Sequence, residues 1–203
     1  KRESLRGGII SSVVPQITTI VKLAAEKILR GEVLVVGAGI RTGLNIRIDN
    51  PAQLGSDLVV DSVAAIAGYP VPMLIFDMGT ANTVCVIDKN KNYVGGMIYP
   101  GVGVSLDSLT ANASQLGGIS LEAPEHMIGK NTAECMKSGI IYSSAAAIDG
   151  IIDRLSEELE GDVTVIATGG LAKKIIPFCR REIILDDNLL LKGLELIYRK
   201  NRK

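Results

Sequence analysis

Apolar positions along the chain follow two different spacings. Short runs rich in β-branched residues, bounded by glycine, proline, asparagine or lysine, predict strands at residues 8–14, 34–36, 73–76, 83–87, 93–99, 164–167 and 182–185. Apolar residues three or four positions apart predict helices at residues 18–29, 51–67, 105–116, 132–159, 171–178 and 189–201. The two spacings alternate along most of the chain, which indicates an α/β protein.

The order of these elements predicts a particular kind of sheet. Three strands in succession, joined by tight turns between residues 73 and 99, are followed by alternating helices and strands. This order predicts a mixed sheet with helices on its faces, and it resembles the ribonuclease H-like lobe that actin-like ATPases use twice. We expect an α/β fold of two ribonuclease H-like lobes. Residues 1–72 would form the remainder of the first lobe and residues 73–203 the second.

The composition limits the partners that we expect. Of the 203 residues, 47% are hydrophobic, which is enough for a sizeable core, and 22 basic residues balance 22 acidic ones. Because there is no net basic field, we expect neither nucleic acid nor an anionic membrane as a partner. No segment approaches the twenty apolar residues of a membrane span. Three cysteines in separate apolar runs are typical of reduced thiols, so we predict a cytoplasmic protein.

A polar turn follows the predicted strand that ends at Phe76. The segment DMGTANT, residues 77–83, places an acidic residue at the strand end, before a glycine and small polar side chains. Gly79 would let the backbone approach a phosphate, Thr80 could donate to phosphate oxygens, and Asp77 could hold a cation. A capped hairpin turn without a ligand would have a similar composition, since Asp, Gly and Thr are common in turns.

A second turn, Thr168-Gly169-Gly170-Leu171, lies where a predicted strand becomes a helix. Exposed amides at a helix N-terminus favour phosphate, and the missing side chains leave room for a flat adenosine group. A plain strand-to-helix turn would look similar. The two turns together resemble the second phosphate motif and the adenosine motif of the actin-like ATPases.

Asp57 lies early in the helix predicted after Asn50 and Pro51, and it follows Gly55 and Ser56. In phosphoryl transfer to an alcohol, a carboxylate accepts the hydroxyl proton, so Asp57 is the candidate general base. The alternative is an aspartate at a helix start that is favoured only by the helix dipole.

The turn at residues 129–131 precedes the predicted helix that begins at Thr132. We expect Thr132 to be the N-cap of this helix, with Glu134 shortly after it. These residue types alone indicate a capped turn, and a ligand role for Thr132 needs information from a family.

The motifs occur in an order that resembles a known family. In chain order they are SSVVP at 11–15, TGL at 42–44, DNP at 49–51, GSD at 55–57, DMGTA at 77–81, GG at 95–96, PG at 100–101, GKNT at 129–132 and ATGGLA at 167–172. Together they span nearly the whole chain and resemble the type III pantothenate kinases. The resemblance implies ATP-dependent phosphorylation of pantothenate to 4'-phosphopantothenate, the first step of coenzyme A biosynthesis. It also implies a homodimer with the active site near the interface.

The resemblance implies roles for individual residues. Asp57 would be the catalytic base, and Asp77 would bind a potassium or ammonium ion. Pantothenate would be contacted by Gly55, Ser56, Asp57 and Leu58, and across the dimer interface by Thr132. ATP, with magnesium, would be bound at the two glycine turns by Gly79, Thr80, Gly169 and Gly170.

The chain departs from the family pattern in four places, the mildest being Asn82 in place of threonine, because an amide can still donate a hydrogen bond. The family's opening strand and its Gly-Asn-Thr phosphate loop are not in this sequence, so we expect the first lobe to be incomplete at its N-terminus. Leu58 and Asn112 stand where the family usually has arginine. The guanidinium group of arginine binds carboxylate or phosphate through two parallel hydrogen bonds, which the aliphatic side chain of Leu58 cannot form. A non-catalytic paralogue that binds a ligand or a protein as a dimer is the alternative function, and a kinase for a less anionic small molecule is another.

Overall fold

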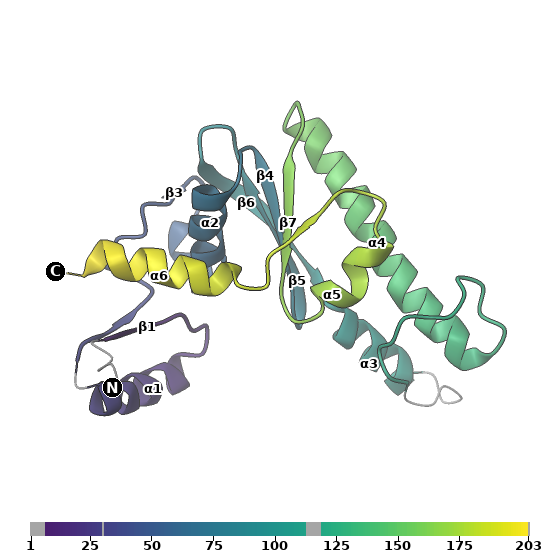
Figure 1. Cartoon of the computed structure of the whole chain (residues 1–203), viewed down its shortest axis with the longest axis horizontal. Helices are drawn as coiled ribbons and strands as arrows, with labels where there is room; N and C mark the ends of the chain where they lie inside the picture. Colours follow the sequence, from purple (N-terminus) through teal and green to yellow (C-terminus); the bar gives the residue numbers. More distant parts are fainter. Residues whose placement is uncertain (1–6, 30, 113–118, 203) are drawn as a thin grey trace, which may run out of the picture. The chain divides into compact units, whose positions relative to one another are not determined.

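The computed structural model describes residues 7–29, 31–112 and 119–202. The chain forms two compact units. Unit 1 comprises the residues up to Tyr69 together with Lys91–Tyr93 and those from Asn188 onward, and unit 2 comprises Pro70–Asn90 and Val94–Asp187. Figure 1 labels the helices and strands of both units.

The described residues of unit 1 form a short parallel pair of strands and three α-helices. Its elements are β1 (Gly8–Ile10), α1 (Pro15–Leu29), β2 (Val33–Val35), β3 (Asn45–Ile46), the 3-10 helix η1 (Pro51–Gln53), α2 (Ser56–Gly68) and α6 (Leu189–Asn201). β1 pairs in parallel with β2, so β1, α1 and β2 make a strand-helix-strand unit. β3 pairs in parallel with Asn92 and Tyr93.

Helix α6 belongs to unit 1 because it packs on α2. Gly193 of α6 lies so close to Val60 of α2 that a Cβ at this glycine would collide with the Val60 backbone. Val60 and Ile197 are fully buried, and together with Val36 they form the core of this unit. The compact units therefore divide the chain differently from a single boundary after residue 72, since the last helix returns to the first unit.

Unit 2 is built on a mixed sheet. Its elements are β4 (Met73–Met78), β5 (Ala81–Ile87), β6 (Asn92–Pro100, of which the first two residues group with unit 1), α3 (Val102–Asn112), α4 (Thr132–Glu158), β7 (Thr164–Thr168), α5 (Ala172–Ile175), the 3-10 helix η2 (Ile176–Phe178) and β8 (Ile184–Leu185). The strand order is β6-β5-β4-β7-β8. β4 pairs antiparallel with β5 and parallel with β7, and β7 pairs parallel with β8.

The core of unit 2 lies between this sheet and the helices α3, α4 and α5. Leu74 and Phe76 of β4 are fully buried, as are Ile141 and Ile148 of α4. The continuous apolar run of β4 is explained by its central place, with a strand on each side. The predicted order of three strands, helices and further strands is the observed order.

Several element boundaries differ from the sequence-based prediction. The helix predicted from residue 51 is η1 followed by α2, because Leu54 and Gly55 are extended and separate them. The helix predicted at 171–178 ends as η2, which contains Pro177. β3 was not predicted, since two residues carry no periodic pattern. The predicted residues 113–116 of α3 lie outside the described part of the chain.

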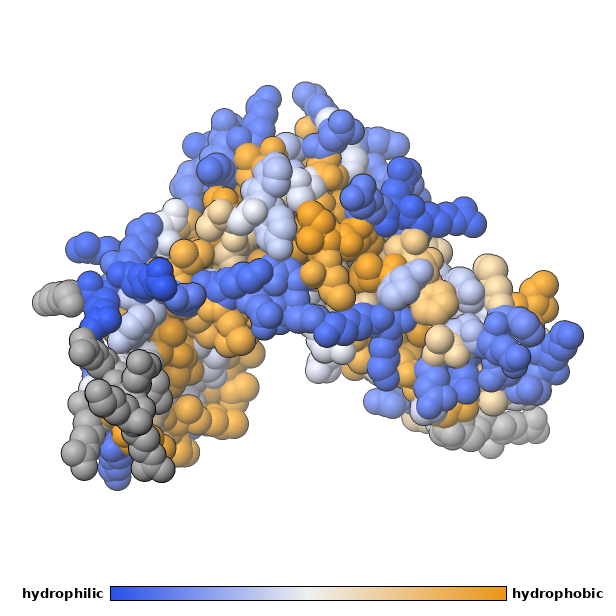
Figure 2. All heavy atoms as spheres, in the orientation of Figure 1, coloured by the Kyte–Doolittle hydropathy of each residue, from blue (hydrophilic) through white to orange (hydrophobic). Residues whose placement is uncertain are grey.

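Helix α1 differs from the other long helices because none of its residues is buried. Ile20 is 68% exposed and Ile28 is 79% exposed. Figure 2 shows the resulting apolar surface, in orange, over the part of the view where Figure 1 draws α1. None of the described helices is both long and apolar enough to cross a membrane.

Candidate functional site

The two predicted glycine turns of unit 2, one for phosphate and one for adenosine, meet at the ends of neighbouring strands. Asp77 of β4 lies beside Thr168 of the parallel strand β7 and opposite Thr83 of the antiparallel strand β5. Residues that are paired across a sheet point to the same face. A carboxylate and two hydroxyls therefore lie on one face of the sheet, immediately before the two glycine turns.

Gly169 is the point of closest approach between these turns. Its φ is +95°, and a Cβ there would lie 2.5 Å from Asp77 Oδ1 and 2.5 Å from the Met78 nitrogen. The backbone that follows Gly169 is held by a hydrogen bond from the Leu171 N–H to the Met78 oxygen, at 3.2 Å. Only glycine fits at position 169, both for its backbone angle and for the space. Gly170 is exposed, and a Cβ there would meet no atom within 4 Å.

The Gly79–Thr80 turn is held by a third glycine. The Gly101 N–H donates to the Thr80 oxygen at 3.0 Å, and a Cβ at Gly101 would collide with the Gly79 and Thr80 backbone. The Gly79 N–H donates to the Ala81 oxygen at 3.3 Å. Thr80 is exposed, so its hydroxyl is available to a ligand such as phosphate.

On the same face of the sheet as Asp77, one buried hydroxyl oxygen lacks a hydrogen-bond partner among the described residues. Thr83 Oγ1 is buried and has no hydrogen-bond partner among the described residues. A buried polar atom of this kind is costly unless something satisfies it. The Thr83 hydroxyl and the Asp77 carboxylate share a face of the sheet, and hard cations prefer such oxygen ligands. These residues therefore fit the predicted cation site. Among the described residues there is no group of three or more His, Cys, Asp and Glu side chains that could hold a metal ion.

Asn82 is a second buried polar residue near the turn. It is 2% exposed, and its Oδ1 has no hydrogen-bond partner in the described part of the chain. It lies opposite Met78, whose side chain belongs to the core. Burial raises the pKa of the Tyr99 phenol, which packs against the same core and stays protonated at neutral pH. We assign no role to Asn82.

In unit 1, Asp57 lies in the first turn of α2. Gly55 is the N-cap of this helix, with φ −57° and ψ 141°. Asp57 Oδ1 accepts a hydrogen bond from the Leu58 N–H at 2.9 Å, and a Cβ at Gly55 would lie 2.5 Å from that oxygen. Asp57 and Leu58 are both partly exposed. The carboxylate is therefore positioned by its own helix start, where the dipole favours its negative charge.

A group of hydroxyls joins this helix start to the loop after β1. Ser56 Oγ lies 2.8 Å from Ser11 Oγ and donates to the Ser12 oxygen at 3.2 Å. Thr18 Oγ1 donates to Ser12 Oγ at 2.8 Å. No pattern in the sequence predicted that residues 11–12 would contact residue 56. The signal that was present is the serine pair at the end of a predicted strand, before Pro15.

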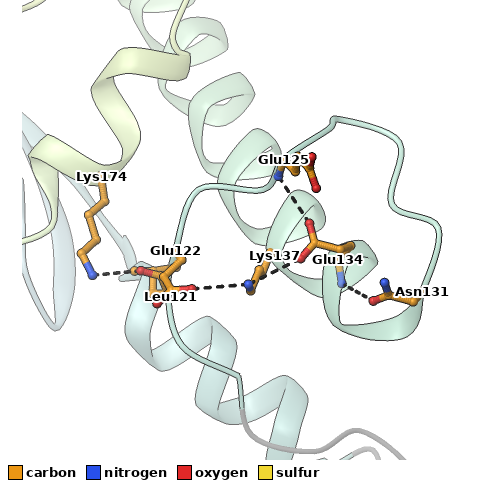
Figure 3. Close-up of polar contacts among 7 residues, drawn as sticks. All are labelled: Leu121, Glu122, Glu125, Asn131, Glu134, Lys137 and Lys174. Carbon is orange, nitrogen blue, oxygen red and sulfur yellow. Dashed lines mark hydrogen bonds and ion pairs between the residues drawn. The ribbon is translucent and has the colours of Figure 1, made fainter.

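Thr132 is exposed at the first position of α4, in unit 2. The prediction that Thr132 caps α4 was wrong. Asn131 is the N-cap, because its Oδ1 accepts a hydrogen bond from the Glu134 N–H at 3.0 Å. The Thr132 hydroxyl is thus not needed for capping. Figure 3 shows the polar contacts around this helix start.

The three cysteines are free thiols. Burial and the negative charge of Asp149 raise the pKa of Cys179 to about 12, so its thiol is protonated and a poor nucleophile at neutral pH.

The strand order and the glycine turns at the strand ends define a mixed α/β protein, the class that the sequence predicted. Comparison with known proteins agrees with this class. The family model for type III pantothenate kinases matches residues 1–154. A type III pantothenate kinase from Bacillus cytotoxicus is 43% identical over 197 residues, which are 97% of this chain and 75% of that protein. The chain belongs to the type III pantothenate kinase family.

One solved structure has a similar fold at low sequence identity. The structure of a conserved putative Baf family transcriptional activator from Campylobacter jejuni is 19% identical, with a TM-score of 0.61 over 97% of this chain and 83% of that one. At this identity the likeness concerns the fold alone. With the family assignment, it confirms the predicted α/β fold.

Proposed function

We propose that the protein phosphorylates pantothenate with ATP, which makes it the kinase of the first step of coenzyme A biosynthesis. The observation that carries the proposal is the junction of Asp77 and Gly169, which forms a strand-end glycine turn in a member of this family. The two glycine turns together offer exposed backbone, the exposed Thr80 hydroxyl and the neighbouring Asp77 carboxylate, which binding of a nucleotide phosphate needs.

ATP binds at the two glycine turns of unit 2. Gly79 and Thr80 contact phosphate oxygens, and Gly169 and Gly170 leave space for the adenosine. Magnesium, bound with ATP, would neutralise charge on the phosphates. A potassium or ammonium ion is held by Asp77, with Thr83 Oγ1 as a further ligand, because this buried oxygen has no other partner among the described residues.

Asp57 is the general base that accepts the proton of the pantothenate hydroxyl. The helix start holds the Asp57 carboxylate through the Leu58 N–H, which leaves the second carboxylate oxygen, Oδ2, to face a substrate. Gly55, Ser56 and Leu58 form the wall of the pantothenate site around this base.

The protein acts as a homodimer in the cytoplasm, and Thr132 of one copy completes the pantothenate site of the other. The exposed hydroxyl of Thr132, which the Asn131 cap leaves unused, supports this role. The free thiols support a reducing compartment.

One observation favours a second function. Leu58 carries no charge or donor at the position next to Asp57, where an anionic substrate would benefit from an arginine. A non-catalytic paralogue would keep the fold and a ligand site without turnover.

Release of ADP separates these functions. We would measure ADP from the full-length protein with ATP, magnesium, potassium and pantothenate, for the wild type, Asp57→Asn and Asp49→Asn. Asp49 is an exposed aspartate of the same unit and serves as the control. Asp57→Asn should lower pantothenate-dependent turnover by about 10³-fold, as expected for a lost general base, and Asp49→Asn should leave it unchanged. Absence of pantothenate-dependent ADP in the wild type would reject the kinase function in favour of the paralogue.

A further inference from the structure

The loop of residues 119–131 leads into α4, and hydrogen bonds and ion pairs hold it to α4 and α5 at several positions. Lys174 of α5 donates to the Leu121 oxygen at 2.9 Å, near the start of the loop. Asn131 caps α4 at the end of the loop. Figure 3 shows that the contacts between these two points converge on one face of α4. Thr132 follows the last residue of the loop, so the position of its hydroxyl depends on how the loop is held.

Glu134 and Lys137 form the centre of these contacts. Lys137 Nζ lies 3.4 Å from Glu122 Oε2 and 3.5 Å from Glu134 Oε1. The second oxygen of Glu134 accepts a hydrogen bond from the Glu125 N–H at 3.4 Å. One glutamate and one lysine on successive turns of α4 therefore hold the loop at two separate positions.

The charges in this group depend on one another. Lys137 is the cation between two carboxylates, and its side chain is 19% exposed. By contrast, the side chain of Lys173 on α5, which forms an ion pair with Asp187, is 66% exposed. Desolvation alone would lower the pKa of Lys137, but its hydrogen bonds and charge interactions with Glu122 and Glu134 raise it overall. Lys137 is thus charged throughout the neutral range. Without it, the two carboxylates would face each other with no cation between them.

The end of the loop is fitted closely to α4. Cys135 Sγ donates to the Gly129 oxygen at 3.3 Å, and Ser138 Oγ donates to the Met127 oxygen. A Cβ at Gly129 would lie 2.6 Å from the Glu134 carbonyl carbon. The last residues of the loop are therefore held directly against the first turns of α4, next to Thr132.

We infer that Glu134 and Lys137 are positioning residues for pantothenate, because they hold the loop that sets the place of the Thr132 hydroxyl. The inference rests on the proposed function. It adds a specificity element that does not touch ATP, since the nucleotide is bound at the strand-end turns. Loss of Lys137 should therefore weaken pantothenate binding and leave ATP binding unchanged.

The test compares Lys137→Met, which keeps the length of the apolar stem, with Lys137→Arg, which restores the charge. Lys173→Met is the matched control, because it removes a lysine from an exposed ion pair of the same unit. For each variant we would measure KM for pantothenate, KM for ATP, and hydrogen–deuterium exchange of residues 119–131. Lys137→Met should raise KM for pantothenate about fivefold and speed exchange in the loop. KM for ATP should change less than twofold, and Lys137→Arg should restore most of the wild-type behaviour.

Each other outcome counts against the inference. Equal changes in the two KM values would indicate a general loss of structure, and unchanged exchange in the loop would show that Lys137 does not hold it. An unchanged KM for pantothenate in an active enzyme would reject the positioning role alone. No pantothenate-dependent turnover in the wild type would instead reject the proposed function, and the positioning role with it.

Discussion

The glycine turn after β7 and the helix start at Asp57 hold their candidate site residues in different ways. Gly169 has a φ of +95° and lies against the backbone of Met78, so steric exclusion fixes the turn. Gly55 has an ordinary φ of −57°, and the atom nearest to its missing Cβ is the Asp57 carboxylate oxygen. One turn is fixed by backbone packing and the other by hydrogen bonds of side chains.

This difference predicts which changes the two regions tolerate. Backbone packed against backbone cannot move without disturbing the sheet, whereas a side chain at a helix start can adopt another rotamer at little cost. Substitution at the β7 turn should therefore affect stability and nucleotide binding together. Substitution at the Asp57 turn should affect the chemistry and leave the fold intact.

The largest effect is expected from Gly169→Ala. A non-glycine residue at this positive φ costs about 1–2 kcal/mol, and the overlap with Met78 adds about 1–3 kcal/mol. The two costs sum to about 3 kcal/mol, which lowers Tm by about 10 °C in a protein of this size and should also raise KM for ATP. The control is Gly170→Ala, where a Cβ meets no atom within 4 Å. Thermal unfolding that is equal for the two variants would contradict the steric account of this turn.

Gly55→Ala should give the opposite pattern. Alanine is compatible with the φ of Gly55, and its lower backbone entropy in the unfolded chain offsets its weaker N-cap preference. The new methyl group would displace the Asp57 carboxylate, so kcat should fall about tenfold while Tm stays nearly constant. Circular dichroism melts and steady-state kinetics on one preparation measure both. A large loss of stability would show that this turn is also fixed by packing.

Leu58→Arg tests the effect of a positive charge and hydrogen-bond donors next to Asp57. A guanidinium beside Asp57 would supply charge and donors for the anionic substrate, so KM for pantothenate should fall about fivefold, the equivalent of about 1 kcal/mol. Leu58→Met, which adds neither charge nor donors, is the control. If arginine changes KM no more than methionine does, Leu58 does not line the pantothenate site in the way that we propose.

The sequence predicted the glycine turn better than the helix start, for a physical reason. β4 and β7 are continuous apolar runs, so their ends and the turns after them could be placed from the pattern alone. That both turns meet at one sheet edge follows from parallel pairing of the two strands. The resemblance to the family supplied the roles of the residues, which neither periodicity nor composition contains.

The parts that could not be predicted depend on contacts between distant residues or on very short elements. The Ser11–Ser56 contact joins residues 45 positions apart, and no local sequence pattern indicates it. Return of α6 to unit 1 depends on the fit of Gly193 against Val60. The N-cap of α4 could not be chosen from the sequence, because Asn131 and Thr132 are adjacent and both residue types are good N-caps. In the structure the Asn131 side chain accepts the capping hydrogen bond.

The smallest predicted effect concerns the hydroxyls behind the Asp57 turn. If hydrogen bonds fix this turn, Ser11→Ala and Ser56→Ala should each destabilise the protein slightly, and the double variant should cost less than the sum of the two. The coupling should be about 0.5–1 kcal/mol, as for a partly buried hydrogen bond between neutral groups. Urea unfolding of the four proteins of the cycle measures it, with Ser11→Ala and Ser143→Ala as a pair expected to be additive, since Ser143 lies on α4 in the other unit. Strict additivity of the Ser11 and Ser56 variants would mean that the hydroxyl contact does not hold the loop to the helix, and the Asp57 turn would then have to be fixed by its own backbone.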